Sequence, residues 1–526
     1  MTLGHQFDVA IPDQLNLTNY VVEDRIKEGR GNRIAVYYQD ETYTFNDLCG
    51  LTNRMGNVLK DFDVSFEDRV LLILQDSPHW LAGWFGTMKI GGVATHAYTY
   101  LKPTDYEYFM NYVRPKVVIA DNTTIERVRT GAKGSIYPEA ILVDGENLKD
   151  PREREHDLLP LMEAADSRLE TAPTSKNDLA LWNFSGGTTG KPRGVPHMHH
   201  DMVVGFESFK DSVKYNEDDI VLRVPKLFFH YSRDLGMDYA LRAGASVALY
   251  PDRSTAEVVF KMIEKYRPTV LLNVPTMMRA MLQTPKEKRG DMSSLRLCLA
   301  SGEQMSAALY KEYTETFGVE VINTIGSAET YLGYFGDYPG EVVPGSAGKL
   351  FPLVEIKILD QNGKEVRKGE TGVLWVKSDA SGWCYHMDHE KTKSIFLGND
   401  WVNTNDLFSE DEKGYYWYKG RADDLIKVSG VYVAPMEIEK CLEKHEAVRE
   451  CVVLGLKDDD DLVKAKAFIG LKDGFEGSEK LAKEIQSFCR EEMASYKVPR
   501  HIEFFPELPK TGQGKIDKRQ LRERGL

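Results

Sequence analysis

The sequence predicts an α/β protein: a large N-terminal domain of parallel-rich sheets with helices plus a small β-subdomain, and a smaller α+β C-terminal domain. Three observations predict it. Short apolar runs alternate with amphipathic stretches through the first 300 residues, the pattern becomes antiparallel over 354–376, and it changes again beyond residue 420. A chain of 526 residues is long enough for one large body and a smaller appendage.

The first part of the chain is expected to form parallel sheets covered by helices on both faces. Predicted strands lie at 70–74, 117–120, 179–184, 245–250, 269–274 and 295–300. Two helix starts are also expected, because Thr44 and Thr276 each offer a capping hydroxyl before an apolar periodic stretch.

The later part of the chain is expected to be built differently. Alternation over 354–376 with a turn at 361–364 predicts an antiparallel hairpin. Beyond residue 420 the order is helix 435–445, strand 450–456, an acidic turn at 458–461, strand 466–471, helix 478–493 and strand 502–505. This is a compact α+β domain of about 100 residues.

Composition excludes several classes of protein. The net charge is −14 and no basic stripe stands out, which argues against nucleic acid or an anionic membrane as the main partner. The six cysteines lack metal-finger or disulfide-framework spacing. The N-terminus lacks a secretory signal pattern, and no apolar run reaches the roughly 18 residues of a membrane span, so the expected location is cytoplasmic.

Residues 184–195, FSGGTTGKPRGV, form the most informative segment. Its glycines allow close approach of backbone N–H groups to anionic oxygens, the threonines add donors, and Lys191 and Arg193 add positive charge, which indicates a polyphosphate site. It is not a P-loop, because Gly186 and Gly190 enclose three residues and Pro192 follows the lysine. A flexible surface loop is the alternative.

Four further segments carry candidate chemistry. Glu329, after the glycine turn at 325–327, could ligate Mg²⁺, or could be an exposed strand-end glutamate. Asp406 could accept both hydroxyls of a ribose. The charged run at 420–430 predicts an interdomain hinge or a charged linker. Lys515, which follows Gly512 and Gly514 near the C-terminus, could neutralise charge on a phosphate, or could be a solvated tail lysine.

Taken in this order, the five segments resemble the adenylate-forming superfamily of acyl-CoA synthetases, non-ribosomal peptide synthetase adenylation domains and beetle luciferases. The match runs from 44–48 to Lys515, and the runs 226–229, 325–327, 414–418 and 427–433 resemble the benzoate-CoA ligase branch. The resemblance implies an AMP-forming acid-CoA ligase that uses ATP, Mg²⁺ and coenzyme A. A carboxylic acid attacks the α-phosphate of ATP, and the CoA thiol then displaces AMP from the acyl-adenylate.

The resemblance also implies two domains joined by a hinge: an adenylation domain at 1–420, a hinge at 421–423 and a mobile C-terminal domain at 424–526. A homodimer is compatible with the resemblance. The implied catalytic residues are Lys515, Lys427 and Asp423, and the metal ligand is Glu329. Cofactor-binding positions are Ser185, Gly187, Thr188, Thr189, Lys191, Glu303, Ser327, Ala328, Asp406, Arg421 and Gly430. Acid-binding positions are Phe229, His230, Tyr231, Gly302, Gly326, Gly333 and Tyr334.

Departures from the family pattern refine these expectations. Ala328 stands where a threonine usually bonds the α-phosphate, a loss of roughly 1.5 to 3 kcal/mol unless Ser327 or Thr330 compensates. Asn405 replaces the usual glycine before Asp406.

The acid pocket is expected to suit a small cyclic acid. His230 is expected to be a wall of the pocket rather than an acid or base, and Gly333 is expected to enlarge the pocket for an alicyclic or substituted aromatic acid. The alternatives are a medium-chain fatty acid-CoA ligase, an enzyme loading a carrier-protein thiol, and a catalytically poor adenylate-binding regulator.

Overall fold

The computed structural model describes residues 9–145, 153–186, 191–331, 333–398, 400–428, 431–457, 463–510 and 516–525. The chain forms two compact units. The first comprises Met1–Glu355 with Val376–Asn403, and the second comprises Ile356–Trp375 with Thr404–Leu526. The predicted hinge at 421–423 lies inside the second unit.

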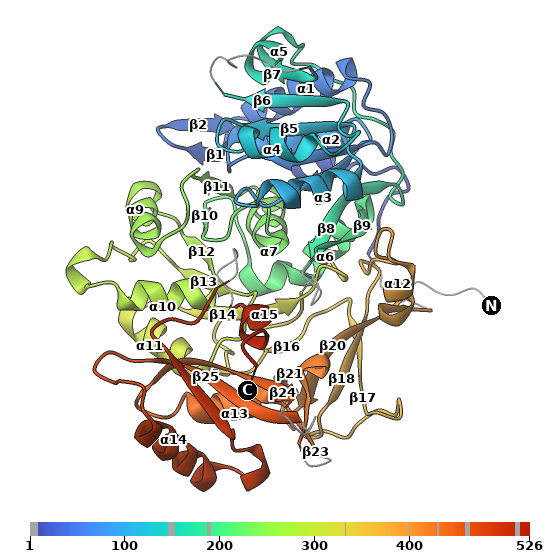
Figure 1. Cartoon of the computed structure of the whole chain (residues 1–526). Helices are drawn as coiled ribbons and strands as arrows, with labels where there is room; N and C mark the ends of the chain where they lie inside the picture. The colour runs from blue at the N-terminus through green and yellow to red at the C-terminus, as the bar shows by residue number, and fades with distance from the viewer. Residues whose placement is uncertain are drawn as a thin grey trace. The chain divides into compact units, whose positions relative to one another are not determined.

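A seven-stranded sheet forms one part of the first unit (Figure 1). Its order is β7 (Glu155–Asp157), β6 (Ala140–Asp144), β5 (Val117–Asp121), β3 (Arg69–Ile73), β4 (Val93–His96), β8 (Leu179–Ser185) and β9 (Arg193–Met198). Every pair is parallel except β8 with β9. The strands predicted at 70–74, 117–120 and 179–184 are confirmed here.

Alternate residues of these strands face different helices. Leu71 and Val118 pack with α3 (Pro103–Val113) and α4 (Ile125–Ala132) in one buried cluster. On the opposite face, Gly83 of α2 (Pro78–Lys89) lies against Leu72 and Ile119. Since successive side chains of a strand point to opposite faces, helices cover the sheet on both sides, as predicted. Helix α1 (Phe45–Asp61) packs on α2.

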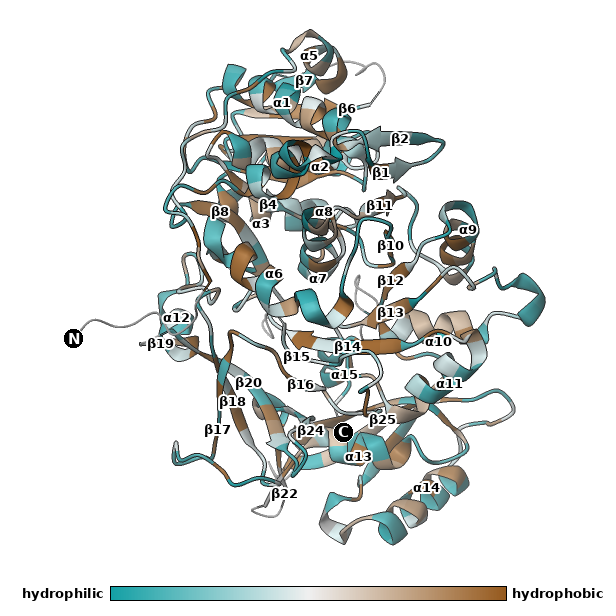
Figure 2. Ribbon diagram, turned by 180° about the vertical axis from the view of Figure 1, so that it is seen from behind, coloured by the Kyte–Doolittle hydropathy of each residue, from teal (hydrophilic) through white to brown (hydrophobic). Residues whose placement is uncertain are grey.

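A nine-stranded sheet forms the other part of the first unit. Its order is β16 (Lys349–Leu350), β15 (Gly333–Gly336), β14 (Val321–Gly326), β13 (Leu297–Ala300), β12 (Val270–Asn273), β10 (Ile220–Arg223), β11 (Ser246–Leu249), β1 (Ile34–Tyr38) and β2 (Glu41–Thr44). The central strands are parallel and strongly hydrophobic, as the brown ribbons of β12, β13 and β14 show (Figure 2). Helices α9 (Ala256–Tyr266), α10 (Pro275–Gln283) and α11 (Ala307–Phe317) supply one buried cluster against this sheet.

One predicted helix cap is confirmed and the other is wrong. The Thr44 hydroxyl accepts a hydrogen bond from the Asp47 amide at 3.2 Å, and the Asp47 carboxylate accepts one from the Thr44 amide at 2.9 Å. Helix α10 instead begins at Pro275, so Thr276 lies inside the helix and Val274 takes the cap position. Proline suits the first helical position because its missing N–H would have no partner there.

The second unit holds the predicted hairpin and the small C-terminal sheet. Residues 356–375 and 404–421 supply most of β17 (Glu355–Leu359), β18 (Gly372–Lys377), β20 (Trp401–Glu410) and β21 (Tyr416–Arg421). The following elements are β22 (Ile426–Val428), β23 (Val431–Val433), α13 (Pro435–Leu442), β24 (Val448–Lys457), β25 (Val463–Leu471), α14 (Glu479–Glu492), β26 (His501–Phe505) and α15 (Lys518–Arg522). The predicted order and the α/β class are confirmed, while residues 458–461 of the acidic turn lie outside the described residues.

Within the described part of the chain, the helices are all too short or too polar to cross a bilayer. The described residues also contain no cluster of three His, Cys, Asp or Glu side chains that could hold a metal ion. All six cysteines are free thiols, which agrees with the absence of disulfide spacing in the sequence.

Asp337, directly after β15, gives the fold a pH dependence. Its carboxylate accepts a hydrogen bond from the Asn323 amide at 2.9 Å, and burial raises the pKa of the carboxyl group from its usual 3.8 to about 7. The folded state therefore binds this proton more tightly than the unfolded state, and the free energy of unfolding falls as pH rises from about 4 to about 7.

Asp337→Asn should remove this dependence. We expect the variant to gain stability relative to the parent protein over that pH range, by up to about 4 kcal/mol, measured as urea midpoints at pH 4, 5.5 and 7.5. A constant difference between the two proteins across these pH values would contradict the assignment.

Candidate active site

The phosphate-loop segment is a hairpin at the end of the seven-stranded sheet. Strand β8 leads into it and β9 leaves it, with Ser185 paired to Arg193. Lys191 is exposed, and its Nζ lies 4.8 Å from the centroid of the Tyr108 ring. The Tyr108 hydroxyl donates to the Pro192 carbonyl at 2.8 Å, so α3 fixes the exit side of the loop. Gly187, Thr188 and Thr189 lie outside the described residues.

A segment near residue 385 lies along β9 and was not foreseen from the sequence. The Arg193 Nε donates to the Asp388 carboxylate at 2.7 Å, and the guanidinium lies 5.8 Å from the centroid of the Tyr385 ring. The His386 amide donates to the Gly194 carbonyl at 2.9 Å. The phosphate loop is therefore supported by residues about 190 positions later in the chain.

Glu329 lies in the turn between β14 and β15. These strands are antiparallel, with Gly326 paired to Gly333, and the turn carries Ser327 and Ala328. The Tyr385 hydroxyl donates to Glu329 Oε1 at 2.7 Å. Burial and the neighbouring Glu329 carboxylate hold the pKa of Tyr385 well above its usual range, so the hydroxyl remains a donor. A half-buried carboxylate with one oxygen so oriented fits a hard cation such as Mg²⁺.

Ala328 points into a small apolar cluster. The side chain is 4% exposed and packs with Val195, Tyr385, Ile395 and Val402. Its carbonyl accepts a hydrogen bond from His197 Nε2 at 2.8 Å. The hydroxyl oxygens of Ser327 and Thr330 lie 3.3 Å apart in the same turn, so two hydroxyls lie close together where the alanine offers none.

The predicted acid-binding residues Phe229, His230 and Gly302 are brought together. Phe229 precedes α7 (His230–Arg233), and its ring centroid lies 5.4 Å from that of His230. Gly302 has φ +85°, and a Cβ there would lie 3.6 Å from the Phe229 ring. The Tyr231 hydroxyl is used within the sheet, where it donates to the Leu299 carbonyl at 2.8 Å.

The other predicted residues of this group have clear local roles. A Cβ on Gly333 would lie 2.7 Å from Thr324 Oγ1, so the missing side chain makes room for that hydroxyl, and the enlargement of the acid pocket stays a prediction. Tyr334 is fully buried. The Thr276 hydroxyl donates to the Glu303 carboxylate, with distances of 2.7 and 2.6 Å to its two oxygens, and so fixes Glu303.

A buried charged cluster beneath His230 was missed by sequence reasoning. Arg233 is fully buried, pairs with Asp234 at 2.6 Å and contacts His96 Nε2 at 2.9 Å. It also donates to the Asn183 side chain on β8, and its guanidinium lies 4.3 Å from the Trp84 ring centroid. The cluster thus ties α7 to the strand that enters the phosphate loop. No single-sequence signal separates such an arginine from a surface one.

The predicted ribose and hinge residues of the second unit also meet. Asp406 and Arg421 are paired across β20 and β21, with Arg421 Nη1 3.1 Å from Asp406 Oδ1. Asn405 donates to the Asp423 carboxylate. Asn405 has φ +59°, a left-handed conformation that glycine and asparagine adopt more readily than other residues, which explains why asparagine can replace the usual glycine.

The remaining predicted residues are described only in part. Lys427 lies in β22, opposite Tyr432 in β23, and its side chain is outside what the structure describes. Gly430 and Lys515 also lie outside the described residues. Lys510 and Ile516, which flank the segment that carries Lys515, form an antiparallel bridge.

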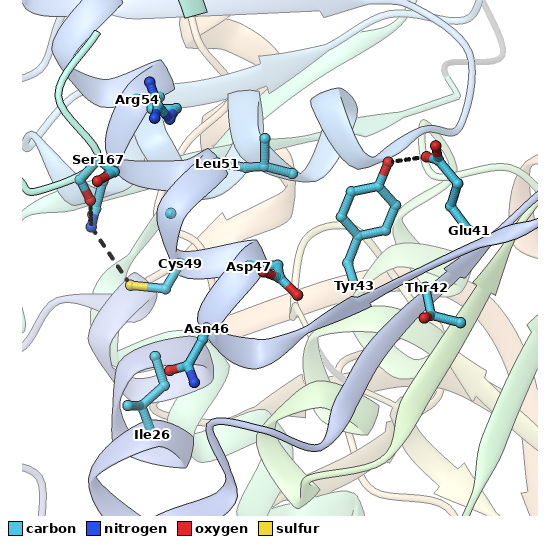
Figure 3. Close-up of a pocket in the computed structure, with 12 residues that line it drawn as sticks. Ile26, Glu41, Thr42, Tyr43, Asn46, Asp47, Cys49, Leu51, Arg54 and Ser167 are labelled. Carbon is cyan, nitrogen blue, oxygen red and sulfur yellow. Dashed lines mark hydrogen bonds between the residues drawn. The ribbon is translucent and has the colours of Figure 1, made fainter. Parts of the chain in front are cut away.

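A surface groove of about 860 Å³ lies elsewhere on the first unit (Figure 3). It is lined by the start of α1 and by neighbouring residues that include Tyr43, whose hydroxyl donates to Glu41 at 2.5 Å. The described residues that line it include none of the predicted site residues.

Comparison with known proteins identifies the family of the chain. Residues 22–386 match the AMP-binding enzyme family, and residues 437–515 match the AMP-binding enzyme C-terminal domain. Benzoate–CoA ligase of Thauera aromatica is 32% identical, with 98% of this chain and 97% of that protein covered. The 4-hydroxybenzoate–CoA/benzoate–CoA ligase of Rhodopseudomonas palustris is also 32% identical, over 96% of this chain and 93% of that protein.

Solved structures give the same result. The anthranilate CoA ligase AuaEII, in complex with anthranoyl-AMP, superposes with a TM-score of 0.91 at 35% identity, covering 98% of both chains. A benzoate CoA ligase from Burkholderia xenovorans LB400 gives 0.86 at 31% identity, covering 97% of this chain and 100% of that one. With its fold, its phosphate-loop hairpin and both family domains in place, the chain belongs to the AMP-binding enzyme family, within the adenylate-forming superfamily that its motifs indicate.

Proposed function

We propose that this chain is an AMP-forming acid-CoA ligase that activates a small aromatic or alicyclic carboxylic acid. The observation that carries the proposal is that Tyr385 links the phosphate-loop hairpin to Glu329 within the first unit. Its hydroxyl donates to the Glu329 carboxylate, and its ring lies beside the Arg193 guanidinium. The full-length relatives that bear benzoate or anthranilate in their names support an aromatic acid rather than a medium-chain fatty acid.

The reaction needs alignment of two anions and stabilisation of charge on the α-phosphate. In the proposal, the loop with Thr188, Thr189 and Lys191 holds the β- and γ-phosphates, and Asp406 with Arg421 binds the ribose. Lys515 bridges the acid carboxylate and the α-phosphate. Asp423 is the hinge about which the C-terminal domain turns to bring Lys427 and Gly430 to the thiol.

Glu329 is the proposed ligand of the nucleotide-bound Mg²⁺. The metal would supply charge neutralisation on the phosphates. The protein's part is to hold the carboxylate ready at the end of β14, where Tyr385 already orients one of its oxygens.

A carboxylic-acid panel tests the function. It spans benzoate, 2-aminobenzoate, hydroxybenzoates, cyclohexane- and cyclohexene-carboxylates and medium-chain fatty acids, read out as pyrophosphate release and as CoA thioester. We expect cyclic acids to give both products. If no acid in the panel elicits pyrophosphate release, the enzyme proposal is refuted. Thioester formed on a carrier-protein thiol but not on CoA would make the carrier protein, and not CoA, the acceptor.

The Ser327 hydroxyl is expected to make the hydrogen bond to the α-phosphate that a threonine usually makes at position 328 and that Ala328 cannot make. Its hydroxyl lies in the same turn, beside Thr330. Ser327→Ala should therefore slow acid-dependent pyrophosphate release about tenfold, the effect of losing one hydrogen bond to a charged group. The measurement is pyrophosphate release at saturating acid and ATP.

The matched control keeps the hydroxyl at the same position. In Ser327→Thr, we expect most of the rate to be retained, whereas Ala328→Thr would bury its hydroxyl in the apolar cluster around Ala328 and is not a suitable rescue. An undiminished rate in Ser327→Ala would mean that the α-phosphate does not depend on this hydroxyl.

The proposal also includes a cytoplasmic location and a homodimer, both of which are expectations from the sequence. A sedimentation measurement on the purified chain tests the second of them.

A further inference from the structure

Two separate stretches of the first unit hold the turn that carries Glu329. The Gly382 amide donates to the Glu329 carbonyl at 2.8 Å, and His197 on β9 bonds the preceding carbonyl. A Cβ at Gly382 would lie 2.6 Å from a Val195 methyl and 3.3 Å from the Glu329 carbonyl oxygen, so the close approach requires glycine. These contacts fix the backbone of Glu329 independently of its side chain.

The Tyr385 ring is fixed as well. It is 6% exposed, packs with Val195, Ala328, Ile395 and Val402, and makes an edge contact with Phe396 at 5.1 Å between ring centroids. A buried aromatic ring has few available rotamers, so its hydroxyl has one direction in which to donate. That direction is toward Glu329 Oε1, at 2.7 Å.

The glutamate side chain has more freedom than the ring. Fixing a long flexible side chain costs on the order of 1.5 kcal/mol of rotamer entropy. Among the described residues, only the Tyr385 hydroxyl bonds this carboxylate. A hydrogen bond to one carboxylate oxygen leaves Oε2 as the oxygen for a cation, and partners that orient a ligand in this way typically contribute 10- to 100-fold to metal affinity.

We propose that Tyr385 is a positioning residue that holds the Glu329 carboxylate for the metal of the bound nucleotide, an inference that rests on the proposed function. The same ring lies beside the Arg193 guanidinium, whose Nε bonds Asp388 at 2.7 Å. One tyrosine thus connects the cationic side of the phosphate loop to the metal-binding turn. The Glu329 carboxylate and the Arg193 guanidinium therefore neighbour the same side chain.

The test is Tyr385→Phe, which removes the hydroxyl and keeps the ring. We expect the affinity of the enzyme–ATP complex for Mn²⁺, measured by electron paramagnetic resonance without any acid present, to fall about tenfold. The Mg²⁺ concentration for half-maximal pyrophosphate release should rise by a similar factor, with the rate at saturating Mg²⁺ largely retained. ATP binding in the presence of EDTA should not change. Mn²⁺ binding equal to that of the parent protein would overturn the proposal.

Two further variants separate positioning from packing. Phe396→Leu changes the ring's packing partner without touching the hydrogen bond, and it should leave the metal dependence unchanged; a tenfold effect there would assign the loss to packing. Glu329→Gln should weaken Mn²⁺ binding more than Tyr385→Phe does, and the double variant should lose nothing further. An additive loss would place the action of Tyr385 elsewhere.

The binding measurement needs no carboxylic acid, so it is distinct from the test of function. If the chain activates no acid, pyrophosphate release fails in the parent protein at every metal concentration. The effect of Tyr385→Phe on Mn²⁺ binding would still be measurable.

Discussion

Lys515→Ala should slow the adenylation half-reaction about 10²- to 10³-fold, the usual effect of losing one preorganised charged donor at a developing charge. The lysine is proposed to neutralise the acid carboxylate and the α-phosphate together, so removing it affects the transition state more than ATP binding. The measurement is acid-dependent pyrophosphate release under single-turnover conditions. Thioester formation from preformed acyl-adenylate should be nearly unchanged.

Lys510→Ala is the matched control for this prediction. Lys510 flanks the same segment, but its Nζ pairs with Glu450. We expect it to alter adenylation by less than about threefold, because a partly exposed ion pair contributes little. An undiminished adenylation rate in Lys515→Ala would remove that lysine from the proposed mechanism.

Asp423→Pro should abolish thioester formation while leaving adenylation largely intact. Asp423 lies in the short helical turn Ala422–Asp424, whose geometry suits the fixed φ of proline. The substitution should therefore preserve the turn seen here and oppose the backbone rotation that the second half-reaction needs. The two half-reactions are measured separately, by pyrophosphate release and by CoA-dependent consumption of acyl-adenylate.

Asp423→Ala and Asp423→Asn serve as controls for the hinge. Alanine loses the contact from Asn405, asparagine keeps an acceptor oxygen, and neither restricts the backbone. Both should retain thioester formation within about tenfold. Equal loss of both half-reactions in the proline variant, or equal damage by alanine, would refute a hinge at this position.

The order of elements was predictable because local signals specify it. The strand at 117–120, for example, is β5 (Val117–Asp121), and the helix at 478–493 is α14 with Ser478 as its cap, since apolar periodicity and a capping serine both lie in the segment itself. The cap at Thr276 was wrong because the helix begins at the preceding proline, which moves the cap two residues earlier, to Val274.

The supporting residues of the site could not be predicted in this way. Motif spacing indicated Glu329 and Asp406, because their chemistry depends on neighbours in the sequence. Tyr385 contacts Glu329 across 56 positions and Arg233 contacts His96 across 137, and no local pattern encodes such meetings. Only the assembled sheets bring these side chains together.

The buried Arg233–Asp234 pair also determines how the site responds to dissolved ions. Salt screens exposed charges over about 8 Å at physiological ionic strength, but it does not enter a fully buried cluster. Lys191 is exposed and subject to that screening, whereas Arg233, Asp234 and Asn183 are not. The helix that begins at His230 and the strand that enters the phosphate loop are therefore joined by an interaction that salt weakens far less than it weakens the exposed charge of Lys191.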